Sequence, residues 1–271
     1  MMQNKKSLGQ HWLKNRAILE EIAELAAGGV IGDDVDVKGG AQEIAEKTGV
    51  ETVKTCVEIG PGLGTLTSSL FRRFERVVAV EYDAELAAKL PGQFPGKNLT
   101  VINEDILKFD FGEVGEPYAV AGNIPYYITS PIIERILKAE HQPERAVLLM
   151  QKEVAERIVS ERESVLSLMC KNLAEVRLGP VVLAEEFTPP PQVDSQVLVL
   201  IPHTPTVPEE VFKLIRLGFV APRKKLIHNL EAIGDKEELR DMFLRLKINV
   251  DARPADLKLM DWWNLYQKMY E

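Results

Sequence analysis

The 271-residue sequence contains few of the residues that build metal centres and disulfide frameworks. Its two cysteines, Cys56 and Cys170, form no C-x-x-C pair, and its four histidines lie far apart in the sequence. Structural zinc sites and disulfide-rich scaffolds need closely spaced groups of such residues. We therefore expect no disulfide framework and no metal site.

Long apolar runs are also missing. No segment approaches the roughly 20 consecutive apolar residues that cross a bilayer, and residues 1–14 carry lysines without the apolar stretch of a secretory signal. We expect a cytoplasmic protein with no membrane partner. The length allows one α/β domain, alone or with a smaller appendage.

An excess of positive charge is absent as well. The net charge of −8 argues against a protein that coats nucleic acid generally. Basic residues nevertheless gather locally, at Lys5 and Lys6 and again at Arg223, Lys224 and Lys225. The simpler explanation of such clusters is a solvated face, so RNA contact cannot be inferred from charge alone and depends on the motifs.

Apolar strand patterns alternate with helical patterns through the first two thirds of the chain, which predicts a parallel sheet. A helix capped by Asn15 precedes this region, and a short helix is expected at residues 42–47. Ser130 and Pro131 are typical of an N-cap and a first helical position. The expected strands cover residues 55–59, 76–81, 99–103, 118–121 and 146–150, followed by an edge hairpin of 176–183 and 197–201.

Only helical patterns appear after Pro202. Prolines at 202, 205 and 208 are typical of a stiff linker, although a helical layer packed on the sheet would leave the same trace. We expect a separate helical lobe. Its predicted helices cover 211–219, 224–233 and 236–247, with a last one after residue 254.

A glycine-rich turn follows the first strong strand pattern. Gly60, Gly62 and Gly64 have the spacing G-x-G-x-G, which differs from the dinucleotide fingerprint G-x-G-x-x-G, and Pro61 lacks an N–H that could bind phosphate. A nucleoside without phosphate fits such a loop better. A G-x-G alone is weak evidence, since it is often only a tight turn.

Polar residues stand at the ends of the next strand patterns. Glu81 is placed to accept hydrogen bonds from both hydroxyls of a ribose, and Asp105 from an adenine amino group. The alternatives are a solvated acid for Glu81 and a helix cap or turn for Asp105. Carboxyl ends of parallel strands share one edge of the sheet, which favours a common cofactor site.

The segment Asn123-Ile124-Pro125-Tyr126 follows the apolar run 118–121 at the same expected edge. An amide, a ring-locked backbone carbonyl and an aromatic face at one point suit a flat, planar amine. The simpler alternative is a turn, since Asn and Pro both favour turns.

Four ordered motifs now carry a resemblance that covers nearly the whole chain. They are Ser-Leu-Gly-Gln-His-Trp-Leu at residues 7–13, the glycine-rich turn at 58–67, the segment 123–126, and Phe-Thr-Pro-Pro-Pro-Gln-Val-Asp-Ser at 187–195. In this order they resemble the KsgA (RsmA) family of ribosomal RNA small-subunit adenine dimethyltransferases. The implied fold is a Rossmann-like class I methyltransferase sheet with helices on both faces and a small C-terminal α-helical domain.

The resemblance implies transfer of methyl groups from S-adenosylmethionine to the N6 amines of two adjacent adenines near the 3′ end of small-subunit ribosomal RNA. Residues 1–202 would form the methyltransferase domain and 203–271 the helical RNA-substrate domain, acting as a monomer on a pre-30S-like particle. The implied cofactor contacts are His11, Leu13, Gly60, Gly62, Glu81, Asp105 and Asn123. The implied contacts to the target adenine are Asn123, Pro125, Tyr126 and Phe187. The two basic clusters supply the expected RNA contacts, which are Lys5, Lys6, Arg223, Lys224 and Lys225.

The chain departs from the family pattern in three places. Residues 28–52 form an excess, residues 160–167 are shorter than the usual loop, and the C-terminal basic signature is modified at 223–230. Three other functions remain as alternatives. They are a large-subunit RNA adenine methyltransferase of the antibiotic-resistance type, a non-catalytic RNA-binding factor on the same fold and, more distantly, a nicotinamide dehydrogenase.

Overall fold

The computed structural model describes residues 10–29, 53–115 and 117–270. The chain divides into two compact units, residues 1–155 with 177–202 and residues 156–176 with 203–271. The segment 156–176 therefore groups with the C-terminal helices, although the sequence placed it in the first domain. The assignment of cofactor and RNA binding to separate domains stays a prediction. Lys5, Lys6 and the helix predicted at 42–47 lie outside the described residues.

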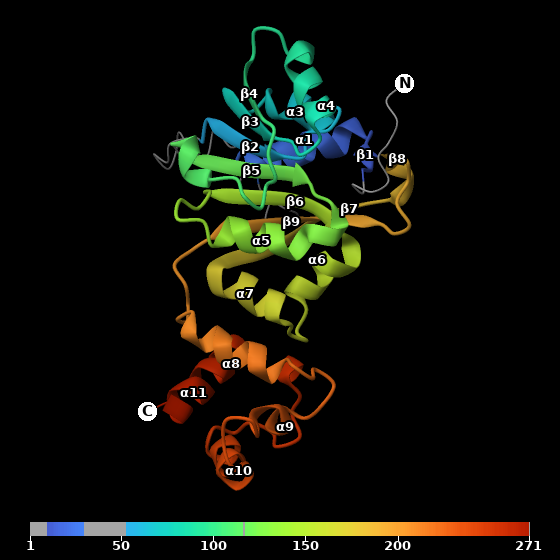
Figure 1. Ribbon diagram of the computed structural model, residues 1–271. Coiled ribbons are helices and arrows are strands. Elements are labelled where there is room, and N and C mark those ends of the chain that lie inside the picture. Colours follow the sequence, from blue (N-terminus) through green and yellow to red (C-terminus); the bar gives the residue numbers. More distant parts are fainter. Residues whose placement is uncertain (1–9, 30–52, 116, 271) are drawn as a thin grey trace. The chain divides into compact units, whose positions relative to one another are not determined.

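The first unit is built on a seven-stranded sheet with the order β4-β3-β2-β5-β6-β9-β7 (Figure 1). The first five of these strands pair in parallel, and β9 runs antiparallel to β6. The predicted parallel sheet, with two late strands at one edge, is thus confirmed. The strands are β2 (Thr55–Ile59), β3 (Arg76–Val80), β4 (Asn98–Ile102), β5 (Tyr118–Asn123), β6 (Arg145–Gln151), β7 (Ala174–Val182) and β9 (Ser195–Pro202).

The central strands are apolar because both faces of the sheet are covered. Every residue of β2 is buried, as are the first five residues of β5. Buried parallel strands read as continuous apolar runs rather than alternating ones. The register pairs Ile59 with both Val80 and Gly122, so the carboxyl ends of β2, β3 and β5 are level with one another.

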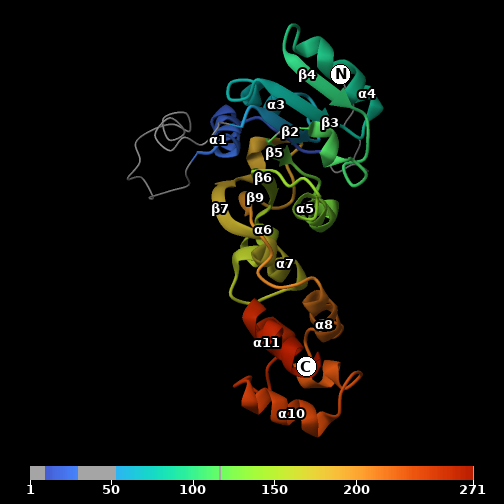
Figure 2. The same ribbon diagram turned by 90° about the vertical axis from the view of Figure 1, so that its left-hand side faces the viewer.

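The first helix begins where the sequence predicted. Asn15 caps α1 (Arg16–Ala26) by accepting hydrogen bonds from the backbone N–H groups of Ala17 at 3.0 Å and Ile18 at 3.4 Å. This helix covers one face of the sheet together with α3 (Thr65–Leu70), whereas α5 (Thr129–Leu137) lies on the opposite face (Figure 2). The helix α4 (Ala84–Lys89) follows β3.

The predicted start of α5 is wrong by two residues, because the sequence placed the N-cap at Ser130 and the first helical residue at Pro131. Ser130 is exposed and lies inside the helix, which begins at Thr129. A short 3-10 turn, η4 (Tyr126–Ile128), runs directly into α5, and the N-cap residue Ile128 makes no side-chain capping bond. The Thr129 hydroxyl instead donates to the backbone carbonyl of Tyr126 at 3.1 Å.

A second, two-stranded sheet joins distant parts of the chain. Its strands β1 (Trp12–Leu13) and β8 (Phe187–Thr188) pair antiparallel, with Leu13 opposite Phe187. Both of these side chains are buried in the core that α1 and α3 share with the large sheet. The pairing brings the segment around His11 next to the proline-rich segment after Phe187.

The second unit is helical, as predicted. Its helices are α7 (Val165–Leu173), α8 (Glu210–Gly218), α9 (Leu226–Leu230), α10 (Lys236–Arg245) and α11 (Leu259–Tyr270); α6 (Lys152–Val159) spans the boundary between the units. Trp262 is fully buried against Gly218 of α8. Trp263 is half-buried and stacks on Tyr266 along the same helix. The first of these tryptophans is therefore core, as the helical spacing predicted.

The shortened segment at 160–167 is held by a buried carboxylate. Glu163 accepts hydrogen bonds from the Lys171 ammonium at 2.8 Å and the Ser167 hydroxyl at 2.7 Å. Lys258, which lies 95 residues further along the chain and in the same unit, is 3.5 Å from the same carboxylate. Buried charges persist in proteins when they are paired and hydrogen-bonded, as this one is.

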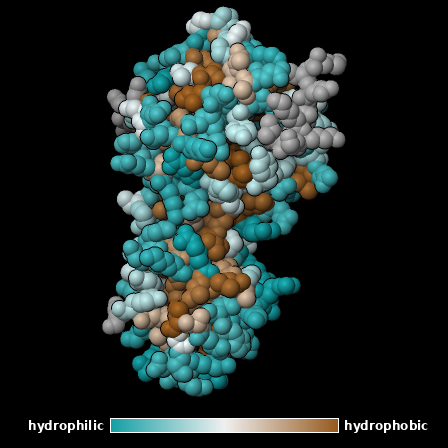
Figure 3. Space-filling model, viewed as in Figure 1, coloured by the Kyte–Doolittle hydropathy of each residue, from teal (hydrophilic) through white to brown (hydrophobic). Residues whose placement is uncertain are grey.

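Hydrophilic side chains predominate on the visible faces of both units (Figure 3). Within the described residues, no helix combines the length and apolar character needed to cross a membrane.

Candidate functional site

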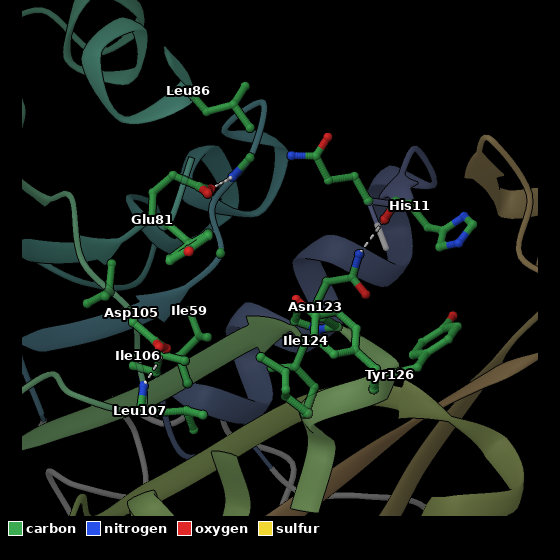
Figure 4. A pocket seen from close by; sticks show the side chains of 18 of the residues that line it. His11, Ile59, Glu81, Leu86, Asp105, Ile106, Leu107, Asn123, Ile124 and Tyr126 are labelled. Atoms are coloured by element: carbon green, nitrogen blue, oxygen red, sulfur yellow. Dashed lines mark hydrogen bonds between the residues drawn. The ribbon is translucent and has the colours of Figure 1, made fainter. Parts of the chain in front are cut away.

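A cavity of about 350 Å³ opens at the carboxyl ends of β2, β3 and β5 in the first unit (Figure 4). Most of the predicted site residues line this cavity: His11, Gly60, Gly62, Glu81, Asp105, Asn123, Pro125 and Tyr126. Residues from five separate chain segments thus converge. Four of these segments stand at the ends of parallel strands, which deliver their carboxyl ends to one edge. Their individual roles stay predictions.

The glycine-rich turn offers few free donors to a ligand. All three glycines have positive φ, from 57° to 78°, a region that side-chain-bearing residues rarely adopt. The N–H of Gly60 donates to the carbonyl of Val80 at 2.9 Å, that of Gly64 to the carbonyl of Pro61 at 2.9 Å, and that of Gly62 to Glu81. Because these donors are already bound, the turn is not a phosphate cradle.

Glu81 is buried at the end of β3, and each of its carboxylate oxygens accepts one backbone hydrogen bond. Oε2 accepts from Gly62 N–H at 3.0 Å and Oε1 from Asp83 N–H at 2.8 Å. Burial raises the pKa of this carboxyl, and the charge of Asp83 adds to the shift, while the backbone N–H groups of Asp83, Gly62 and Tyr82 oppose it. Each oxygen keeps a second acceptor position, which suits a pair of neighbouring hydroxyls.

Asp105 performs a local structural role and also lines the cavity. Its Oδ1 accepts a hydrogen bond from Leu107 N–H at 3.0 Å, which fixes the turn after β4. The turn alternative predicted for this residue is therefore correct as far as backbone geometry goes. It leaves the second carboxylate oxygen available at the cavity wall, where Ile106 and Leu107 supply the apolar surroundings.

The charge of the cavity wall selects among ligands. Three carboxylates, from Glu81, Glu104 and Asp105, lie among the lining residues, and no lysine or arginine does within the described part of the chain. A pyrophosphate would meet negative charge without a compensating cation. A neutral or cationic nucleoside derivative meets hydrogen-bond acceptors of the correct sign.

Asn123 is held in one orientation by the segment before β1. Its Nδ2 donates to the backbone carbonyl of His11 at 2.7 Å. Because a carbonyl oxygen can only accept, the amide nitrogen must face His11 and the Oδ1 atom is left to accept from a ligand. Figure 4 shows Asn123 and Tyr126 on one side of the cavity, with Glu81 and Asp105 on the other.

Tyr126 is anchored at its hydroxyl. The phenol oxygen lies 2.7 Å from the Oγ atom of Ser195, which is fully buried at the start of β9. Burial raises the pKa of the phenol, and the hydrogen bond between Tyr126 and Ser195 opposes this shift. The ring lies nearly parallel to that of His11, with centroids 6.0 Å apart. The His11 ring is itself fixed, because Nδ1 lies 2.8 Å from the carbonyl oxygen of Pro189 and must donate to it.

The backbone carbonyl of Pro125 is only weakly engaged within the protein. It lies 3.3 Å from the N–H of Ile128 and 3.5 Å from the hydroxyl of Thr129, both at the long end of the hydrogen-bond range. This oxygen can therefore accept a stronger hydrogen bond from a planar amine in the cavity.

Two predicted contacts, Leu13 and Phe187, do not line the cavity. Both side chains are about 1% exposed and pack in the core beneath it. These two residues contribute to the site through the pairing of β1 with β8, which positions His11 at the cavity wall. The basic residues Arg223, Lys224 and Lys225 are exposed in the second unit, and Lys225 pairs with Asp251 at 2.6 Å.

Several lining residues were not predicted from the sequence. Their side chains are mainly apolar or aromatic, and such residues are usually core; only their position next to a strand end distinguished them. They are Val80, Tyr82, Leu86, Glu104, Ile106, Leu107, Tyr127 and Ile128, whereas Gln10, Trp12, Ile59 and Ile124 were known only as parts of motifs.

The sheet order, with its antiparallel strand β9 between β6 and β7, and the acidic cavity at the strand ends define a class I methyltransferase fold. Comparisons with known proteins narrow this class. Residues 38–270 match the model of the ribosomal RNA adenine dimethylase family. The chain belongs to this family.

Curated relatives match over nearly the full chain. The chain is 35% identical to the ribosomal RNA small subunit methyltransferase A of Rippkaea orientalis, covering 97% of this chain and 96% of the relative. The protein of the same name from Acaryochloris marina is 36% identical, with 97% and 96% covered.

Solved structures share the fold. A dimethyladenosine transferase from Plasmodium falciparum superposes with a TM-score of 0.72 at 25% identity, covering 96% of this chain and 98% of the other. The 23S rRNA methyltransferase ErmE gives a TM-score of 0.71 at 25% identity, with 96% and 100% covered.

Proposed function

We propose that this protein transfers methyl groups from S-adenosylmethionine to the N6 amines of two adjacent adenines near the 3′ end of small-subunit ribosomal RNA. The single observation that supports this most strongly is the placement of Asn123, with its amide oriented by His11, in a cavity walled by carboxylates. Family membership supplies the reaction class.

The cavity fits S-adenosylmethionine by its donor and acceptor set. Glu81 keeps acceptor positions for both ribose hydroxyls, and Asp105 keeps one for the adenine amino group. The acidic wall favours a cationic ligand, and the occupied N–H groups of the glycine turn suit a cofactor without phosphate. When bound, this cofactor supplies an activated methyl group on sulfur.

Asn123 and Pro125 prepare the target amine. The N6 lone pair of adenine is delocalised into the ring, so the amine is planar and a poor nucleophile. Oδ1 of Asn123 and the carbonyl of Pro125 accept hydrogen bonds from its two N–H groups, which favours pyramidal geometry and localises the lone pair on N6. Fixed acceptors of this kind need no reorganisation during the reaction.

Tyr126 holds the base. Its ring offers an aromatic face at the cavity wall, and the hydrogen bond to Ser195 prevents it from rotating out. The adenine must leave its stack to reach this site, and stacking on an aromatic side chain compensates part of that cost.

Small-subunit RNA is favoured over large-subunit RNA by the comparisons. The relatives at 35–36% identity are named small subunit methyltransferases, whereas ErmE, named for 23S rRNA, is 25% identical. The proposed partner is a pre-30S-like particle in the cytoplasm, bound by a monomer. Arg223 and Lys224, exposed in the second unit, are proposed to contact its phosphates.

The direct test is methyl transfer to defined acceptors. We expect incubation with labelled S-adenosylmethionine to label immature small subunits at two adjacent adenines, and to leave large subunits unlabelled. Mapping the modified nucleotides by mass spectrometry identifies the sites. Label in large-subunit RNA would replace the proposed substrate with that of the antibiotic-resistance enzymes.

Ser195 offers a test of how Tyr126 is held. Ser195→Ala removes the partner of the phenol hydroxyl, so we expect turnover to fall several-fold while the Kd for S-adenosylmethionine is unchanged. A single hydrogen bond of this kind contributes about 1 kcal/mol. If the two groups act as a pair, Ser195→Ala combined with Tyr126→Phe will lose no more than the worse single variant. Additive losses would show that the hydroxyls act separately.

A further inference from the structure

An exposed aromatic residue stands at the mouth of the cavity and has no role in the mechanism above. Tyr127 follows Tyr126 directly in η4, lines the cavity and is 64% exposed. Among the described residues, none forms a hydrogen bond or a ring contact with its side chain. Its phenol ring is therefore available to a ligand on the solvent side of the site.

The local backbone explains why two adjacent tyrosines differ so much. In a 3-10 helix there are three residues per turn, so successive side chains point about 120° apart. Tyr126 is fixed inward by Ser195. Tyr127 is consequently directed away from the anchored ring and toward the opening, while the turn is held by the hydrogen bond from Thr129 to the Tyr126 carbonyl.

The proposed substrate needs a second stacking surface at this position. When one adenine leaves its stack and enters the cavity, the neighbouring base loses a stacking partner. A planar ring at the cavity mouth, one residue away from the ring that holds the target, is placed to replace that partner. Stacking of bases on aromatic side chains is tolerant of base identity, because each base has a π-face.

We propose that Tyr127 is the stacking platform for the nucleotide adjacent to the target adenine. This inference rests on the proposed function, because it concerns the second of two adjacent adenines. Each adenine in turn would enter the cavity while its neighbour stacks on Tyr127. The residue would thereby keep the RNA in register between the two modifications.

The test uses wild-type protein and Tyr127 variants, with an RNA stem-loop or immature small subunit that carries the two adenines. Tyr127→Ala should raise the KM for RNA about 10-fold and leave the Kd for S-adenosylmethionine within 2-fold. Tyr127→Phe keeps the ring and should behave as wild type. Tyr127→Leu keeps much of the apolar area without a π-face and should resemble the alanine variant.

An altered RNA substrate measures the contribution of the base next to the target adenine. If the adjacent adenine is replaced by an abasic nucleotide, the wild-type protein should lose the same factor in KM that Tyr127→Ala loses, and the variant should lose nothing more. Tyr82→Ala is the matched control, since Tyr82 is also 64% exposed and lines the same cavity beside Glu81. That variant should retain the full effect of the abasic nucleotide.

Three outcomes would contradict the proposed stacking role of Tyr127. They are an unchanged KM in Tyr127→Ala, a loss confined to cofactor affinity, and an abasic effect that adds to the variant's loss. A different result would contradict the proposed function itself: wild-type protein would transfer no methyl group to small-subunit RNA in the same assay. The stacking role of Tyr127 would then be contradicted as well, because it depends on that function.

Discussion

Replacing Asn123 by alanine is expected to lower the rate of methyl transfer about 100-fold, since removing one fixed polar contact to reacting atoms has effects of this size. The variant removes the Oδ1 acceptor for the target amine. It leaves Glu81 and Asp105 in place, so much of the affinity for S-adenosylmethionine should remain. Single-turnover transfer to small-subunit RNA measures the first quantity and calorimetric titration of the cofactor the second.

Asn123→Asp is the informative comparison. It keeps an oxygen acceptor but cannot donate to the His11 carbonyl, which now lies 2.7 Å from the amide nitrogen. We expect its transfer rate to fall between those of wild type and Asn123→Ala. Equal turnover in wild type and Asn123→Ala would remove Asn123 from the mechanism. Equal loss in both variants would assign the effect to the His11 hydrogen bond.

The site residues at the strand ends could be predicted because each follows an apolar run that is visible in the local sequence. Gly60, Glu81, Asp105 and Asn123 each follow a short apolar run, and the rule that parallel strands share one carboxyl edge brings them together. The sequence did not show that Asp105 both fixes a turn and lines the cavity. That outcome depends on the Leu107 N–H, which the backbone alone provides.

Side-chain direction limited the rest of the prediction. Phe187 and Leu13 were expected at the site, but their pairing in a two-stranded sheet turns both into the core. That pairing joins segments far apart in the chain, and no local pattern encodes it. Tyr127 is the converse case, because the sequence did not single it out and it lines the cavity. Its exposure depends on the 3-10 turn, which directs its side chain away from that of Tyr126.

A second large effect is expected from a buried acid behind the glycine turn. Glu58 in β2 is about 1% exposed, and its Oε2 accepts a hydrogen bond from the Thr67 hydroxyl of α3 at 2.6 Å. Burial raises the pKa of this carboxyl to about 8, opposed by the Thr67 hydrogen bond and reinforced by the charge of Glu81. Glu58 is therefore protonated in the folded protein at neutral pH.

The direction of the pH dependence follows from the proton balance. Between pH 4.5 and about 8 the folded protein keeps a proton on Glu58 that the unfolded chain releases. The free energy of unfolding must therefore fall as the pH rises through this window, and the contribution levels off above the folded pKa. The full difference between the ordinary pKa of 4.5 and the raised pKa of about 8 corresponds to about 5 kcal/mol, of which about 4 kcal/mol is expressed at pH 8.

Glu58→Gln tests this directly, because glutamine resembles the protonated acid and does not titrate. We expect the variant to be more stable than wild type at pH 8 and similar to it at pH 5, with a difference at pH 8 of about 4 kcal/mol. Urea unfolding at pH 5 and pH 8 measures the free energy of unfolding of each protein. Subtracting the wild-type value from that of the variant at each pH removes the contribution of all other titrating groups. Parallel pH profiles would mean that Glu58 is ionised in the folded state. Glu75→Gln, at an exposed carboxylate paired with Lys54, is the control and should leave the pH profile of wild type unchanged.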